Sequence, residues 1–327
     1  MGARRPGGRG SGHPVRSGSR TARRGAAAVL VALGTLLAAC SPEAEPSRDR
    51  ATATAAAQPP ATTPQTAAKL LREYLGSLRA PGAAGRLEGG ATRAVHDAQR
   101  RYTEGPQPAI AAEFAIPRIS GYPKWFAAGA VRPGMTGDVA IFVQSRKGAR
   151  WRVHHLAYLT HPMPELSRDA EGYVTVAEPG DLPARQANAL TRRIQQPAEA
   201  AASGAPAGGD PATALSDALG RNARLFTGHA WTVRHQASPQ GRSYALRTRD
   251  GGTVVWYVLA YTFTATNNAG RFEITLSDEA AGLLRDPVVS RSLVWEARYQ
   301  SVAHAPAEGA ERILGIALPG WTAMRGA

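Results

Sequence analysis

The chain contains two segments whose apolar residues recur at helical spacing. Each is followed by segments in which apolar and polar residues alternate, as in β-strands. After Thr63-Pro64, apolar residues recur every three or four positions up to Leu78, which predicts a capped amphipathic helix. The same spacing follows Asp210-Pro211 and predicts a second capped helix. A thinner apolar stripe predicts a short helix over residues 91–102.

Strand-like segments follow each long helix. In the first half they are expected at 112–120, 125–132, 138–144 and 150–159, and in the second half at 230–235, 243–249, 253–264, 271–276, 292–303 and 313–317. Lys147-Gly148 and Asp250-Gly251-Gly252 are turn signals between neighbouring strands. Aromatic residues on both faces of segment 253–264 predict a central strand covered on both sides, and Asn267-Asn268 predicts that 271–276 pairs beside it.

The order of elements predicts the α+β class with two small domains, each an N-terminal helix packed on a curved antiparallel sheet. The expected boundaries are 67–194 for the first domain, 195–209 for an Ala/Pro/Gly-rich linker and 210–327 for the second domain. This architecture resembles the cone-shaped fold of nuclear transport factor two and its relatives, or the smaller cystatin-like fold. The resemblance concerns architecture and transfers no activity.

Residues 1–39 have the three parts of a secretory signal peptide. A stretch with seven arginines and no acidic residue precedes an apolar run, Gly25–Ala39, which is shorter than the ~20 residues of a membrane-spanning helix. The run ends in Leu37-Ala38-Ala39-Cys40, which resembles the lipobox of bacterial lipoproteins. The resemblance implies cleavage before Cys40 and attachment of lipid, with acyl chains such as palmitate, to its thiol. Arg23-Arg24 leaves both general and twin-arginine export open.

Residues 40–66 contain no large apolar side chain and are expected to form a disordered tether. A lipid on Cys40 would hold the protein on the extracytoplasmic face of the cell membrane. Together with Leu246-Arg247-Thr248-Arg249-Asp250-Gly251-Gly252, the leader, lipobox and tether resemble an uncharacterised family of actinobacterial secreted lipoproteins. That resemblance implies no assigned activity.

The charge balance argues against a nucleic-acid partner. The formal net charge is +14, but the seven leader arginines would leave with the signal peptide, so the net charge of the mature chain would be about +7. This excess comes from arginines scattered along the sequence, whereas a nucleic-acid-binding face needs clustered basic residues. Its partners are instead expected to be the membrane, through Cys40, and an envelope protein or cell-wall polymer. With no second cysteine, the body lacks internal disulfides and a second thiol.

Three groups of side chains are candidates for chemistry. His154, His155 and His161 cluster in the sequence, but adjacent strand residues point to opposite faces, so a shared metal ion is not expected. Asp278, Glu279, Asp286 and Glu296 could supply paired carboxylates, although Ser277-Asp278-Glu279 fits the capped first turn of a short helix better. No Gly-x-Ser-x-Gly or Ser-x-x-Lys motif occurs after residue 40.

The six tryptophans could stack on sugar rings. They are Trp125, Trp151, Trp231, Trp256, Trp295 and Trp321. Most are expected in the core, and only Trp125 and Trp321 lie in loop-like contexts that favour exposure.

The residues therefore predict a lipid-anchored extracytoplasmic binding or protein-interaction module, without an identified catalytic residue, cofactor or metal ligand. A small-cavity α+β enzyme and a solute-binding lipoprotein are the alternatives. A buried polar pocket with convergent Asp, His or Arg would favour the enzyme.

Overall fold

The computed structural model describes residues 58–79, 113–195, 211–270, 273–275 and 288–326, without the side chains of 78–79 and 318–323. Its helices are α2 (Pro64–Arg79), α4 (Leu182–Gln195) and α5 (Pro211–Thr227). Its strands are β1 (Glu113–Ala115), β2 (Lys124–Gly129), β3 (Gly137–Gln144), β4 (Arg152–Leu159), β5 (Trp231–Arg247), β6 (Thr253–Asn267), β7 (Ile274–Thr275), β8 (Val288–Val289), β9 (Ser292–Ala305) and β10 (Arg312–Gly326). The predicted leader, Cys40 and the helix expected over 91–102 lie outside the described residues.

Helix α2 forms where the apolar spacing predicts it. The Oγ1 atom of Thr63 accepts a hydrogen bond from the N–H of Thr66 at 3.2 Å and so caps the first turn. Leu71 and Tyr74 are buried in a cluster with β2 and β3. Because α2 begins at Pro64, the ordered body starts before residue 67, inside the last part of the expected tether.

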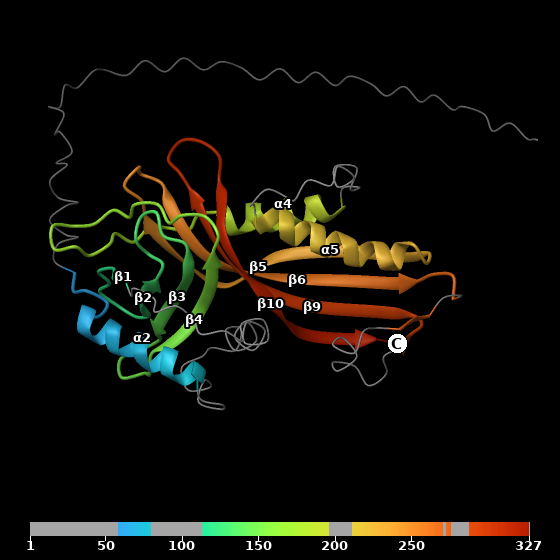
Figure 1. The fold of residues 1–327 in the computed structure, drawn as a ribbon, viewed down its shortest axis with the longest axis horizontal. Coiled ribbons are helices and arrows are strands. Elements are labelled where there is room, and N and C mark those ends of the chain that lie inside the picture. The colour runs from blue at the N-terminus through green and yellow to red at the C-terminus, as the bar shows by residue number, and fades with distance from the viewer. Residues whose placement is uncertain (1–57, 80–112, 196–210, 271–272, 276–287, 327) are drawn as a thin grey trace, which may run out of the picture. The chain divides into compact units, whose positions relative to one another are not determined.

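One antiparallel sheet joins the two halves of the chain. Its order is β1-β2-β3-β4-β10-β9-β6-β5 (Figure 1). The α+β class is confirmed, but the expectation of two separate sheets is wrong. Strand β10 pairs with β9 along most of its length and also with β4, where Gly315 lies opposite Leu159. The domain boundaries proposed from the sequence stay predictions.

Strand β6 lies inside the sheet, as its aromatic pattern predicts. It pairs along its whole length with β9 and along most of it with β5. The pairing expected for 271–276 is therefore wrong, because both edges of β6 are occupied and β7 pairs with β8 instead. The two strands expected at 230–235 and 243–249 form the single strand β5, which has a register shift between Gln240 and Tyr244.

Helices α4 and α5 lie side by side over one face of the long strands (Figure 1). Helix α4 has no counterpart among the elements predicted from the sequence. It buries Leu190 and Ile194 in the same cluster as Leu219 and Phe226 of α5. Leu225 instead points outward and is 65% exposed. None of the helices in the described part of the chain is long and apolar enough to cross a membrane.

The sheet curls so that its short strands pack on the ends of its long strands. Trp125 and Val139 share a buried cluster with Leu246, Val254 and Trp256, which belong to β5 and β6. A second cluster lies under α2 and a third under α4 and α5. Each described helix therefore covers a sheet surface that would otherwise expose apolar side chains.

A close approach of two backbones joins β4 to the long strands. A Cβ atom at Gly315 would lie 2.2 Å from the carbonyl oxygen of Tyr158, so only glycine fits there. Nearby, the buried side chain of Gln300 accepts a hydrogen bond from the N–H of Leu156 through its Oε1 atom. These contacts fix the position of β4, and with it the pocket described below.

Candidate functional site

The histidines singled out in the sequence do not come together at a metal site. His155 is buried and His154 exposed, on opposite faces of β4 as expected. The Nε2 atom of His155 lies 3.1 Å from the carbonyl oxygen of Tyr257, and burial lowers its pKa to about 4, which keeps the ring neutral. His161 lies beyond the end of β4. Among the described residues, no three His, Cys, Asp or Glu side chains gather closely enough to hold a metal ion.

The acidic candidates form no paired-carboxylate site in the described part of the chain. Asp278, Glu279 and Asp286 lie outside the described residues. Glu296 on β9 forms an ion pair with Arg325 of the neighbouring strand β10. That contact has the geometry of a cross-strand pair on a sheet surface.

The tryptophans do not form a sugar-binding platform in the described residues. Trp231, Trp256 and Trp295 belong to the core, as expected for most of them. The exposure expected for Trp125 is wrong: it is 3% exposed, because it lies in β2 and packs on Tyr244, with ring centroids 5.2 Å apart. Trp151 is half-buried against Phe126, and the side chain of Trp321 is outside the described set.

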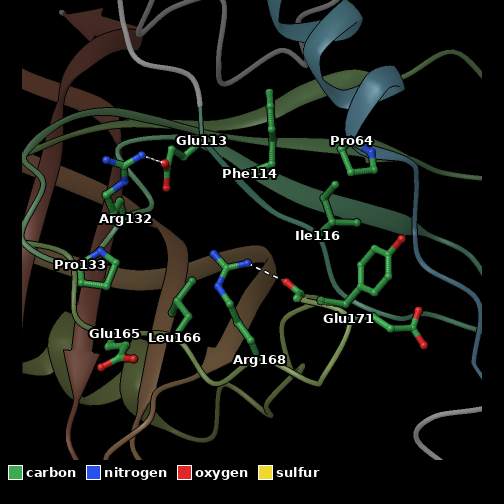
Figure 2. Close-up of a pocket in the computed structure, with 12 residues that line it drawn as sticks. Pro64, Glu113, Phe114, Ile116, Arg132, Pro133, Glu165, Leu166, Arg168 and Glu171 are labelled. Atoms are coloured by element: carbon green, nitrogen blue, oxygen red, sulfur yellow. Dashed lines mark hydrogen bonds and ion pairs between the residues drawn. The ribbon is translucent and has the colours of Figure 1, made fainter.

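A pocket of about 620 Å³ lies between β1, the turn after β2 and the segment 165–173 that follows β4 (Figure 2). Its volume is in the range of small-molecule sites, roughly 300–1,000 Å³. Apolar, proline and glycine residues line part of it: Pro64, Phe114, Ile116, Pro133, Leu166, Gly172 and Tyr173. The charged lining residues are Glu113, Arg132, Glu165, Arg168 and Glu171.

Backbone hydrogen bonds hold the segment 165–173 in place. The N–H of Ser167 donates to the carbonyl of Arg247 at 2.9 Å, and the N–H of Val174 donates to the carbonyl of Ile116 at 3.0 Å. Asp169 closes a turn between these anchors, since its Oδ1 atom accepts the N–H of Tyr173 at 2.9 Å. The pocket wall is therefore built before any ligand arrives.

Arg118 ties this segment to the start of the folded body. Its guanidinium lies 2.7 Å from the carboxylates of both Asp169 and Glu171, and it donates to the carbonyl of Gln58 at 3.0 Å. The same group stacks over the ring of Tyr173, 4.5 Å from the centroid. Arg118 thus shares its single positive charge between Asp169 and Glu171, which is one of the three glutamates of the pocket.

The other two lining glutamates also have arginine partners. Glu165 lies 2.7 Å from Arg249, and Glu113 at the start of β1 forms an ion pair with Arg132. The hydrogen bond from Arg132 holds the pKa of Glu113 below its usual range, and the nearby charge of Arg168 adds to this effect. Glu113 is therefore an ionised carboxylate close to two arginines.

Arg168 has no carboxylate partner among the described residues. Its exposed side chain donates from one Nη atom to the carbonyl of Gly172 at 2.8 Å, which orients the guanidinium and leaves further N–H donors. In Figure 2 its guanidinium points toward the middle of the pocket, on the side opposite Phe114. Each of the three glutamates of the lining is paired with an arginine, and Arg118 also serves Asp169, so the formal charges of the cluster balance. Within the described residues, Arg168 is the lining guanidinium without a carboxylate partner.

The pocket residues are separated widely in the sequence, and no spacing pattern connects them. Glu113 and Arg132 come together through the pairing of β1 with β2, whereas Arg168 arrives on a segment fixed to β5. Among the described residues that line it there is no histidine, cysteine, serine or threonine. The arrangement suits binding of an anion beside an apolar surface and offers none of the usual nucleophile–base pairs.

Comparison with known proteins gives a family and no activity. Searches of the curated proteins and of the solved structures found no match. One family model matches residues 58–319, and these residues hold all the described helices and nearly all of the sheet. The chain therefore belongs to the family of the domain of unknown function DUF8094.

Proposed function

We propose that this protein is a lipid-anchored binding module on the extracytoplasmic face of the cell membrane, and that the pocket between β1 and segment 165–173 is its ligand site. The signal-peptide pattern, the lipobox ending at Cys40 and the apolar-poor segment that follows support the location. In this proposal the family is one of secreted lipoproteins, and segment 40–57 is the tether.

One observation carries the proposal for binding. Arg168 is held by Gly172, points into a pocket of about 620 Å³ and lacks a carboxylate partner among the described residues. A positioned guanidinium with free donors on a concave, partly apolar surface is a binding site for an anionic group. Because the described part of the lining offers no nucleophile–base pair, we favour binding over catalysis for this pocket.

The anchor is tested by Cys40→Ala. The unmodified protein should partition with membranes and resist alkaline extraction, because at least two acyl chains give stable anchoring. The variant should appear in the soluble or secreted fraction. Tight membrane association of both forms would contradict lipid attachment at Cys40.

The ligand site is tested by photo-cross-linking in cells. A benzoyl-phenylalanine replacing Pro133 would lie in the pocket wall, and the same residue at Leu225 on α5 is the matched exposed control. Position 133 should capture an envelope component that position 225 does not, and the additional change Arg168→Gln should abolish the capture. Identical products from both positions would show that the pocket is not the binding site.

A further inference from the structure

The pocket offers a way to identify the chemical class of its ligand. We propose that it binds a free carboxylate carried on an apolar body, such as the C-terminal end of a short apolar peptide. This inference rests on the proposed function, because it assumes that the pocket is a ligand site. Beyond the proposed function, it specifies the charged group of the ligand, the apolar surface that the rest of the ligand would contact, and a carboxylate of the protein that competes with the ligand.

Glu113 shows how a carboxylate fits beside the arginines. Its side chain forms an ion pair with Arg132 and also lies within the electrostatic influence of Arg168. Arg132 is thus engaged by a carboxylate of the protein itself, while Arg168 has donors to spare. A planar guanidinium binds a carboxylate through two parallel hydrogen bonds. An incoming carboxylate would take Arg168 and compete with Glu113 for Arg132.

An apolar wall lies beside the charged end. Phe114, Ile116 and Leu166 line the pocket, with Pro64 and Pro133. In Figure 2 Phe114 and Ile116 lie across the cavity from Arg168, so a ligand held at Arg168 would lay its body along them. A small inorganic anion would use the arginines but leave this wall bare. The combination therefore favours an organic acid with an apolar part.

The N-terminus of α2 supplies a partial positive charge at the pocket wall. Pro64, the first residue of this helix, lies in the pocket wall, and the first turn carries no acidic side chain. The partial positive charge of a helix N-terminus favours anions nearby. It is a supporting contribution beside the guanidinium of Arg168, which points into the pocket (Figure 2).

The experiment is isothermal titration of the folded protein at ~0.15 M salt, where exposed charges are largely screened. The probes are acetyl-alanyl-leucine with a free carboxylate, the same dipeptide as its C-terminal amide, and inorganic phosphate. The free acid should bind at least about tenfold more tightly than the amide, since the amide loses the charge-assisted hydrogen bonds. Phosphate should bind more weakly than the free acid, because it cannot use the apolar wall.

Two variants make opposite changes in affinity. Arg168→Gln should weaken binding of the free acid about tenfold or more and leave the amide unchanged. Glu113→Gln should strengthen binding of the free acid about threefold or more, because it frees Arg132 and removes a negative charge. A gain in affinity cannot come from misfolding. Arg325→Gln, the same charge change on β10, is the control and should leave the affinity within about twofold.

The outcomes separate this inference from the proposed function. Equal binding of acid and amide, or Arg168-dependent binding of phosphate alone, would overturn the carboxylate class while leaving the pocket as a ligand site. A Glu113→Gln variant with unchanged or weaker binding would overturn the internal competitor. If no probe binds but cross-links from position 133 still depend on Arg168, this inference alone fails. If those cross-links are absent too, both fail.

Discussion

Replacement of His155 by Gln should remove a large part of the loss of stability on acidification. His155 is 1% exposed, and its Nε2 atom lies 3.1 Å from the carbonyl oxygen of Tyr257, so the folded protein holds a neutral ring that donates from Nε2. Glutamine can donate a hydrogen bond to the same carbonyl but has no ionisable group. The substitution therefore removes the titration while it keeps a polar partner for Tyr257.

The magnitude follows from the two pKa values of this histidine. Burial lowers the pKa from 6.5 to about 4 in the folded protein. Between these values the unfolded chain binds a proton that the folded protein does not, so the free energy of unfolding falls as the pH falls below 6.5. A full pH unit inside this window costs about 1.4 kcal/mol, but the unfolded histidine is only half protonated at pH 6.5, so the loss between pH 6.5 and 4.5 is about 2 kcal/mol.

Urea unfolding between pH 7.5 and 4.5 measures this difference. The quantity compared is the change in the free energy of unfolding with pH, because the substitution also alters stability at neutral pH. The neighbouring variant His154→Gln is the matched control. Partial desolvation and the charge of Arg152 lower the pKa of His154 as well, but its side chain is exposed whereas His155 is fully buried, so this variant should keep most of the acid sensitivity. If His155→Gln loses as much stability as the unmodified protein over this range, neutral burial of His155 is not the cause.

Two further substitutions test the junction around β4. Gly315→Ala should destabilise the protein by about 3 kcal/mol or more, because the new Cβ would lie 2.2 Å from the carbonyl oxygen of Tyr158. Gly76→Ala, at an exposed position of α2 where a Cβ meets nothing within 4 Å, should instead stabilise the protein by about 0.5–1 kcal/mol. Equal effects of the two substitutions in urea unfolding would refute the close approach at Gly315. Gln300→Leu should lower the free energy of unfolding by about 1–3 kcal/mol, because it removes the acceptor for the N–H of Leu156. Amide hydrogen exchange at Leu156 should become faster, and unchanged exchange would contradict that hydrogen bond.

Local signals in the sequence were enough to predict much of the secondary structure. The cap at Thr63, the hairpin turn after β3 and the aromatic alternation of β6 act within a few residues, so their effects can be read directly from the chain. Helix α4 was missed because few large apolar residues mark it, chiefly Leu182, Leu190 and Ile194. Their burial depends on contact with the long strands.

Long-range contacts account for what the sequence did not reveal. The strand-like run at 313–317 was predicted, but its pairing with β4 depends on the missing side chain of Gly315, which has no local signature. Likewise, the proline-containing context of Trp125 suggests a loop, whereas β2 places it in the core. Strand pairing and the anchored segment 165–173 bring Glu113 and Arg168 together, and no local pattern connects them.

The position of β10 in the sheet affects how the chain folds as it is made. Strand β4 is synthesised before α4, α5, β5, β6 and β9, yet its second neighbour is β10. During synthesis, the edge of β4 stays without this partner until residues beyond 312 have emerged. Such non-local pairing slows folding, and an open strand edge promotes association between chains. A chain arrested before β10 would therefore be prone to aggregate through β4.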